Sequence, residues 1–278
     1  MKIKTYVITG SASGIGRALL LKLAENNIIF AGYRNKSQEA DLKKISSNIY
    51  PFYVDYNEPE TIKKACEYIL SKCTKIDSLI NIAGCVVAGP VEDVNIDEIR
   101  RQFNVNVFGH LDLTQRLLPI LENGKIINVS SMASFGIFPF ISPYCASKRC
   151  LDMFFNSLLV ENKKNIKVIS IKPGVIATPL WGKSIDENSK YFDNYGDYSA
   201  EMKYVIANAQ KNEKSGLSPN KVVDVILKAD RLENPKLSYT VGRDAFLASL
   251  VSKLPQDMIN KIVKFGIKMK VRNSKENL

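Results

Sequence analysis

Histidine, tryptophan and paired cysteines are scarce in this sequence of 278 residues, which has one histidine, one tryptophan and five cysteines. No two of the cysteines form a C-x-x-C pair, and His110 has no neighbour at metal-ligand spacing. We therefore expect no metal site, and we expect His110 to be structural. An odd number of unpaired cysteines predicts reduced thiols and a cytoplasmic protein, with membrane association as an alternative. These cysteines are Cys66, Cys73, Cys85, Cys145 and Cys150.

Long apolar runs are also missing. No stretch approaches the roughly 18 to 20 uninterrupted apolar residues that a membrane-spanning helix needs. The first four residues lead directly into a strand-like segment, so we expect neither a signal peptide nor a transmembrane helix. The hydrophobic content of 45% suffices for one sizeable core. Since no repeat or low-complexity linker interrupts the chain, we expect one domain over residues 1–278.

Acidic residues are outnumbered, with Asp and Glu at 28 against Lys and Arg at 39, for a net charge of +11. This excess suits an anionic cofactor, an acidic membrane surface or nucleic acid, and the charge alone does not choose among them. Nucleic-acid binding would predict an affinity that falls steeply with salt. Because no nucleic-acid motif accompanies the charge, we expect no nucleic-acid partner.

Short runs rich in β-branched and aromatic residues alternate with helix-length apolar patterns. The predicted strands are residues 5–9, 28–33, 50–54, 78–82, 125–129, 166–171 and 237–241. The predicted helices lie near residues 15–25, 58–72, 96–122, 144–163 and 218–231. This order predicts an α/β fold, a doubly wound parallel sheet with helices on both faces.

The stretch from about residue 178 to 216 differs, because it is polar and aromatic without a clear period. We expect it to form a lid over the site. Trp181 either touches substrate or anchors this lid. The other aromatic residues of the stretch are Tyr191, Phe192, Tyr195 and Tyr198.

A glycine-rich turn follows the first predicted strand at residues 9–16, Thr-Gly-Ser-Ala-Ser-Gly-Ile-Gly, and opens a helix. Glycines permit a tight turn and close approach of a pyrophosphate, and a helix N-terminus favours negative charge. Strand, turn and helix occur in the order that phosphate binding requires, against the alternative of a plain turn. We assign cofactor binding to Gly10, Ser13, Gly14, Ile15 and Gly16.

The end of the second predicted strand bears on the choice of dinucleotide. Arg34 and Lys36 follow it, where an acidic residue would bind the ribose of NAD. A guanidinium there can pair with a 2′-phosphate, which favours NADP over NAD; the alternative is a solvated basic loop. Asp55, after the third strand, either accepts a hydrogen bond from the adenine amino group or is a surface turn residue.

Tyr144 and Lys148 lie four residues apart near the start of a predicted helix, so their side chains share one face. A nearby ammonium favours phenolate, so we expect the tyrosine pKa to fall below its usual value of about 10. The same spacing at Tyr68 and Lys72 is better read as an exposed pair. Only Tyr144 has Ser131 upstream, at the end of a strand where open α/β sheets bind ligands.

These features together resemble the short-chain dehydrogenase/reductase family, including its hydroxysteroid and retinol dehydrogenase-like members, over about residues 4–245. The matching features are the turn at residues 9–16, Asn81-Ile82-Ala83-Gly84, Asn106-Val107-Phe108-Gly109, Ser131 thirteen residues before Tyr144, Lys148, and Pro173-Gly174 followed by Thr178. The resemblance implies a Rossmann-type fold and interconversion of an alcohol with a ketone or aldehyde.

The resemblance also implies roles for four catalytic residues. Tyr144 would protonate the carbonyl oxygen, and Ser131 would hold that oxygen. Lys148 would bind the nicotinamide ribose and lower the tyrosine pKa, while Asn106 would position a water that relays protons. The implied cofactor residues are Asn81, Ala83, Gly84, Tyr144, Lys148, Pro173, Gly174 and Thr178, beside those of the turn, Arg34 and Asp55.

The sequence departs from the family pattern twice. Ile82 stands where a second asparagine is usual, and Ser13 stands where many NADP-preferring members have a basic residue. The second departure argues against NADP, so NAD stays an alternative. Relatives are often dimers or tetramers, which implies a homo-oligomer. A non-catalytic NADP-binding regulator of the same fold is the alternative to an enzyme acting on a small-molecule carbonyl or alcohol.

The tail at residues 254–272 mixes apolar residues with lysines and an arginine in a basic amphipathic pattern. It could rest on an acidic membrane surface, flank the entrance for a lipophilic substrate, or pack on its own domain or a partner subunit. The tail also resembles those of relatives that act on steroids and retinoids, which implies a bulky apolar substrate.

Overall fold

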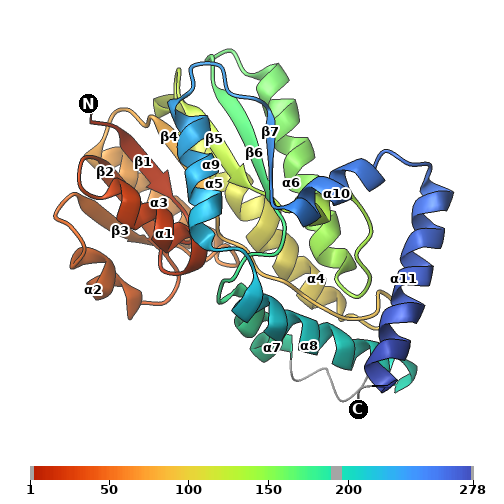
Figure 1. Cartoon of the computed structure of the whole chain (residues 1–278). Coiled ribbons are helices and arrows are strands. Elements are labelled where there is room, and N and C mark those ends of the chain that lie inside the picture. The colour runs from red at the N-terminus through yellow and green to blue at the C-terminus, as the bar shows by residue number, and fades with distance from the viewer. Residues whose placement is uncertain (1–2, 189–195, 277–278) are drawn as a thin grey trace.

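The computed structural model describes residues 3–188 and 196–276. Seven parallel strands form one sheet in the order β3-β2-β1-β4-β5-β6-β7 (Figure 1). They are β1 (Thr5–Ile8), β2 (Ile28–Tyr33), β3 (Ile49–Tyr53), β4 (Ser78–Asn81), β5 (Lys125–Val129), β6 (Lys167–Pro173) and β7 (Ser238–Val241). The seven predicted strands are confirmed within a few residues. The order reverses between β1 and β4, where sheets of this kind bind ligands.

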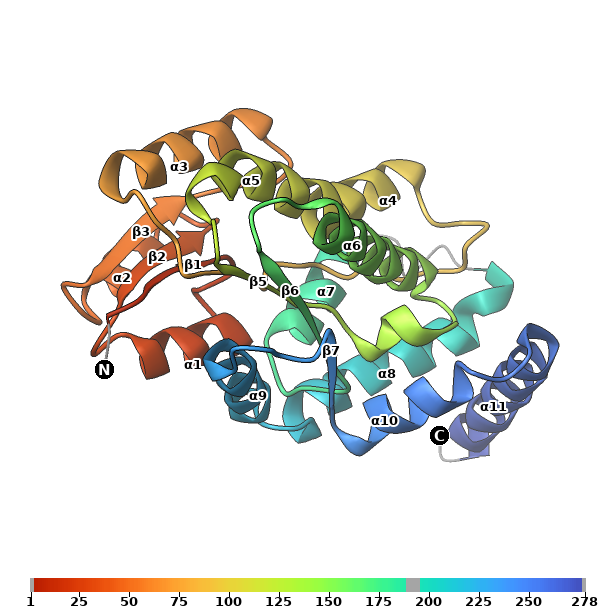
Figure 2. The same ribbon diagram turned by 90° about the horizontal axis from the view of Figure 1, so that it is seen from above.

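Helices cover both faces of the sheet, as predicted (Figure 2). One face carries α1 (Gly14–Leu23), α2 (Gln38–Lys43) and α9 (Pro219–Arg231). The other carries α3 (Pro59–Lys72), α5 (Gly109–Leu117) and α6 (Ser142–Glu161). Because the central strands are buried on both faces, they read as continuous apolar runs in the sequence. The helices bury one stripe each, and together these layers form a single domain.

The helix predicted over residues 96–122 is interrupted. It consists of α4 (Ile96–Phe103), a π-helical segment (Asn104–Phe108), α5 and a short 3₁₀ turn (Leu118–Ile120). π-Helical segments of this kind are frequent at functional sites. Here the segment contains Asn106, whose side chain is completely buried.

The expected lid contains two helices, α7 (Leu180–Asn188) and α8 (Ser199–Ser215). A short 3₁₀ turn (Gly196–Tyr198) leads directly into α8. Tyr191, Phe192 and Tyr195 lie outside the described residues. Helix α7 shows no apolar period in the sequence because its buried positions are the polar residues Ser184 and Asn188. Both side chains donate hydrogen bonds to the Val86 carbonyl, at 2.7 and 3.0 Å. The sequence predicted a lid here but did not indicate that its two long elements are helical.

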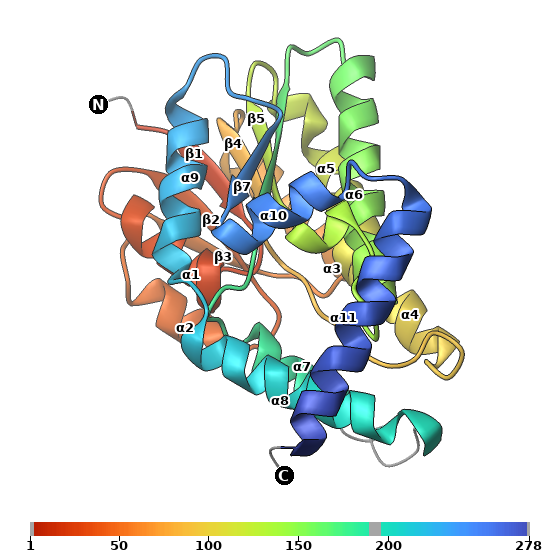
Figure 3. The same cartoon turned by 45° about the vertical axis from the view of Figure 1, so that its right-hand side comes forward.

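Two further helices follow the last strand, α10 (Arg243–Val251) and α11 (Gln256–Glu276) (Figure 3). The amphipathic pattern predicted at residues 254–272 is thus helical. One side of α11 packs beside α8, and Ile259, near the start of α11, is buried. Within the described ranges, no helix is both long and apolar enough to cross a membrane. All five cysteines are free thiols, as expected.

Candidate active site

The glycine-rich turn connects β1 to α1 at the C-terminal edge of the sheet. Gly10 has φ +67° and Gly14 has φ +54°, in the left-handed region that favours glycine. A Cβ atom on Gly16 would lie 2.1 Å from the Gly10 carbonyl oxygen, so the turn closes only with glycine there. The first turn of α1 has no acidic residue, so its free N–H groups can donate hydrogen bonds to an anion.

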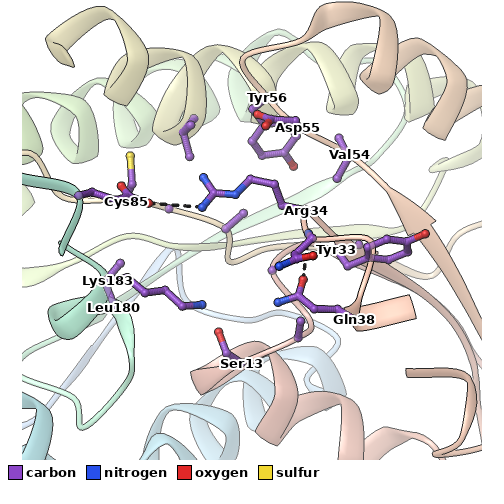
Figure 4. A pocket seen from close by; sticks show the side chains of 18 of the residues that line it. Ser13, Tyr33, Arg34, Gln38, Val54, Asp55, Tyr56, Cys85, Leu180 and Lys183 are labelled. Atoms are coloured by element: carbon purple, nitrogen blue, oxygen red, sulfur yellow. Dashed lines mark hydrogen bonds and ion pairs between the residues drawn. The ribbon is translucent and has the colours of Figure 1, made fainter. Parts of the chain in front are cut away.

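A first pocket of about 430 Å³ extends from this turn across the ends of β2 and β3. Figure 4 shows Arg34 from the end of β2 and Lys183 from α7 extending into the same space. Asp55 lies at the pocket wall, where its carboxylate accepts a hydrogen bond of 2.9 Å from the Asn57 backbone. The predicted cofactor residues that line this pocket are Gly10, Ser13, Arg34, Asp55, Ala83 and Gly84.

An ion pair crosses the first pocket from β2 to the lid. Arg34 contacts Glu187 of α7 at 3.4 Å, and the second oxygen of that carboxylate pairs with Arg101 at 3.2 Å. The Arg34 side chain stays half exposed. The sequence gave no signal for Glu187 or Lys183, because both lie on α7, which has no apolar period.

A second pocket of about 200 Å³ adjoins the first and shares the glycine-rich turn with it. Its lining brings together three of the four predicted catalytic residues with the predicted nicotinamide-side residues. These are Ile15, Ser131, Tyr144, Lys148, Pro173, Gly174 and Thr178. Thr178 also packs over the turn, since a Cβ atom on Gly14 would lie 3.2 Å from its methyl group. The two pockets adjoin each other, since Gly10, Ser13 and Gly84 line both of them.

Tyr144 has a higher pKa than its sequence context predicts. Burial raises the pKa of Tyr144 to about 12, and hydrogen bonding to Ser131 only partly opposes this rise. The expected fall below 10 is therefore wrong for the chain by itself, since desolvation of the phenolate has the largest effect on the tyrosine pKa. Tyr144 is a neutral O–H donor throughout the physiological pH range.

Lys148 and Asn106 lie behind the tyrosine. The Lys148 ammonium donates to the Val129 carbonyl at 3.0 Å and lies 5.8 Å from the centroid of the Tyr144 ring. Burial lowers the pKa of Lys148 to about 8, although Asp152 one turn further along α6 acts in the opposite direction. Gly84 separates Lys148 from Asn106, because a Cβ atom there would lie 3.3 Å from the asparagine oxygen and 3.6 Å from the ammonium.

Asn106 is held rigidly by the π-helical segment. Its amide donates to the Cys85 carbonyl and to the Ser147 hydroxyl, both at 3.0 Å, and its oxygen accepts from the Cys85 N–H at 2.9 Å. Asn106 lies on the opposite side of Gly84 from Lys148 and does not line the second pocket.

The structure does not bring the Asn81 side chain to either pocket. It lies within the sheet and donates to Asn128 of β5 at 2.8 Å. Ile82, one of the two departures from the family pattern, lines the catalytic pocket instead. The backbone N–H groups of Ile82 and Ala83 donate to the Thr9 hydroxyl at 2.9 and 3.2 Å, which fixes this segment against the turn.

His110 also holds the segment of Ile82 and Ala83 in place. Its Nε2–H donates to the Ala83 carbonyl at 2.8 Å, and its ring contacts Tyr56 edge-on at 4.9 Å between centroids. Burial lowers the pKa of His110 to about 3. His110 is structural, as expected.

This buried histidine predicts a pH dependence of stability. Between about pH 3 and 6.5 only the unfolded chain binds the proton of His110, so stability falls as the pH falls. From about pH 7.5 to pH 5 this group should remove about 2 kcal/mol from the free energy of unfolding. Urea unfolding at both pH values should show that His110→Gln loses this part of the dependence. An identical pH dependence in both proteins would contradict it.

Comparison with known proteins agrees with this geometry. The family model described as short chain dehydrogenase matches residues 4–189. The chain belongs to the short-chain dehydrogenase family. It is therefore an oxidoreductase of the NAD(P)-binding Rossmann type, and the family expected from the sequence is confirmed.

Individual relatives match over nearly the whole chain. The NADPH-dependent 3-dehydrocapnine reductase of Ornithobacterium rhinotracheale is 30% identical, covering 92% of this chain and 94% of its own. The 3-ketodihydrosphingosine reductase of Bacteroides thetaiotaomicron is 29% identical, covering 93% and 96%. A short-chain dehydrogenase from Streptomyces avermitilis superimposes with a TM-score of 0.76 at 25% identity, covering 97% of both chains.

Proposed function

We propose that this oxidoreductase reduces a ketone on a long apolar substrate, with NADPH as the hydride donor. The observation that carries the proposal is that the catalytic pocket adjoins a much larger apolar cavity. Both are lined by Met132, Phe138, Ile141 and Trp181. A substrate whose carbonyl lies at Tyr144 would therefore extend its chain past these residues.

The apolar cavity has a volume of about 550 Å³ and lies between the segment after β5, the lid helix α8 and the tail helix α11. Trp181 lines both spaces, and its indole N–H donates to the Ile176 carbonyl at 3.0 Å. Of the two alternatives for this residue, its place in both linings supports contact with the substrate, and its hydrogen bond supports anchoring of the lid. Other apolar lining residues are Val86, Ile137, Phe140, Ile185, Val205, Ile262 and Val263. Such a lining favours an aliphatic chain over a polar ligand.

The names of the relatives support a ketone and NADPH. One is a reductase of a 3-keto compound, and another is NADPH-dependent. Arg34 and Lys183 supply two cations beside the turn, where the 2′-phosphate of NADPH would lie. NADH is the alternative that Ser13 leaves open.

Four residues of the chain would carry out the proton chemistry. Bound NADPH supplies the hydride. Tyr144, neutral because of its raised pKa, donates its proton to the carbonyl oxygen, which the Ser131 hydroxyl also holds. Lys148, with a pKa of about 8, is positioned to stabilise the resulting phenolate. Asn106 would hold a water that returns a proton to Lys148.

Gly266 offers a test of the apolar cavity. It lines the cavity from α11, and a Cβ atom there would meet nothing within 4 Å. Gly266→Leu should lower kcat/KM for a long-chain ketone by about tenfold, because the leucine occupies space that the chain needs, while a short ketone keeps its rate.

The control for this variant is Asn260→Leu, which adds the same side chain on an exposed position of α11. Folding is not at risk, since leucine is the better helix former by about 0.8 kcal/mol. The cavity assignment would be wrong if Gly266→Leu slowed short and long ketones equally.

The proposal of a homo-oligomer rests on exposed apolar side chains at the end of the π-helical segment and along α6. These are Phe108, Met153, Phe154 and Val160, which are 50%, 59%, 41% and 85% exposed. A second copy of the chain would cover them.

A further inference from the structure

We propose that the outer face of α11 docks on an anionic lipid membrane and that the apolar cavity takes its substrate from that membrane. The docking itself follows from the surface of α11. Only the second part, the delivery of substrate, rests on the function proposed above.

The outer face of α11 carries an apolar stripe. Met258, Ile262, Phe265 and Met269 repeat at intervals of four, three and four residues, so they lie along one line of the helix. They are 49%, 49%, 67% and 46% exposed. The inner side of the same helix is packed beside α8, and this stripe lies next to that side, where its side chains stay exposed; Ile262 also lines the apolar cavity.

A stripe of lysines runs beside the apolar one. Lys261, Lys264 and Lys268 each precede a member of the apolar stripe by one residue, which places them about 100° around the helix. All three are exposed, and the sequence has no acidic residue between positions 257 and 276. A helix with adjoining apolar and basic stripes lies in the interface of an anionic membrane, with the lysines at the lipid headgroups.

Exposed apolar side chains also lie on α10, which leads into α11 (Figure 3). Phe246, Leu247 and Leu250 of α10 are 54%, 59% and 44% exposed, and Leu254 in the connection is 37% exposed. Exposed apolar surface of this extent marks an interaction site rather than ordinary solvent contact.

Charge and the position of the cavity favour a membrane over a second copy of the chain. In a symmetric dimer through α11, the lysine stripe of one copy would face the lysine stripe of the other, and their like charges would repel. Anionic headgroups neutralise them instead. Ile262 is half exposed in the outer stripe and also lines the cavity, so the cavity reaches the surface at the docking face. A lipophilic substrate dissolved in the bilayer would meet the cavity there.

Vesicle co-sedimentation of the full chain tests the docking. Wild type should bind vesicles of phosphatidylcholine with phosphatidylglycerol and should not bind phosphatidylcholine alone. Replacing Lys261, Lys264 and Lys268 together by Gln should weaken binding by about 100-fold, at roughly fivefold per lysine. Phe265→Ser should weaken it by about tenfold.

Two control variants separate docking from general attraction by a basic protein. Replacing the exposed Lys44, Lys63 and Lys64 by Gln makes the same change in net charge elsewhere, and Val91→Ser removes an exposed apolar side chain from the segment before α4. Both should bind vesicles like wild type. Equal losses in the two lysine variants, or binding to neutral vesicles as strong as to anionic ones, would overturn the proposal.

Two further readouts complete the test. Sedimentation velocity without vesicles would reveal a dimer that Phe265→Ser dissociates; that result, together with no vesicle binding, would assign the face to a second copy and overturn the proposal. NADPH turnover of a short soluble ketone, measured without vesicles, should be unchanged in every variant. If wild type binds anionic vesicles but turns over no ketone, the proposed function fails while the docking stands.

Discussion

Tyr144→Phe should lower kcat for ketone reduction by about a thousandfold while the Kd for NADPH stays within about twofold. The tyrosine is the buried O–H donor of the catalytic pocket, and phenylalanine keeps its ring and packing but has no proton to give. Stopped-flow absorbance of NADPH measures the turnover, and fluorescence titration measures the binding.

The chain contains its own control for this variant. Tyr68 and Lys72 on α3 repeat the four-residue spacing of Tyr144 and Lys148, far from both pockets. Tyr68→Phe should leave kcat unchanged. Equal rates for Tyr144→Phe and wild type would remove the tyrosine from the reaction.

Arg34→Ala should weaken NADPH binding by about 150-fold and leave NADH binding nearly unchanged. Two charge-assisted hydrogen bonds from a guanidinium to the 2′-phosphate contribute about 3 kcal/mol together, and NADH has no such phosphate. In the present structure Arg34 pairs with Glu187. Since that carboxylate competes with the phosphate, Glu187→Gln should strengthen NADPH binding several-fold.

Lys36→Ala is the matched control, because Lys36 is also basic and exposed and lies two residues further along but does not line the pocket. It should change NADPH affinity little. Isothermal titration of both dinucleotides against each variant gives the result. Loss of NADPH and NADH affinity in equal measure would show that Arg34 does not select the 2′-phosphate.

Local patterns in the sequence were sufficient for the sheet and for most of the site. The central strands are buried on both faces and appear as apolar runs, and the glycine-rich turn follows from geometry that only glycine permits. Tyr144, Lys148 and Ser131, which the sequence predicts as site residues, line one pocket because strand ends and helix starts in this fold meet at one edge of the sheet.

The remaining features depend on contacts between distant segments. Glu187 and Lys183 reach the cofactor pocket from α7, whose inward positions are polar and give no apolar period. The raised pKa of Tyr144 is set by burial, which the sequence does not specify. The Asn81 side chain does not reach either pocket. It hydrogen-bonds Asn128 on the neighbouring strand β5, because the two residues are paired in register and their side chains project from the same face of the sheet.

The proposed reduction of a long apolar ketone is tested most directly by NADPH oxidation with methyl ketones of increasing chain length. If the apolar cavity holds the substrate chain, kcat/KM should rise by up to about fourfold for each added CH₂ group until the cavity is filled. NADPH binding without turnover on any ketone would instead indicate a non-catalytic regulator, and turnover that does not change with chain length would contradict the long apolar substrate.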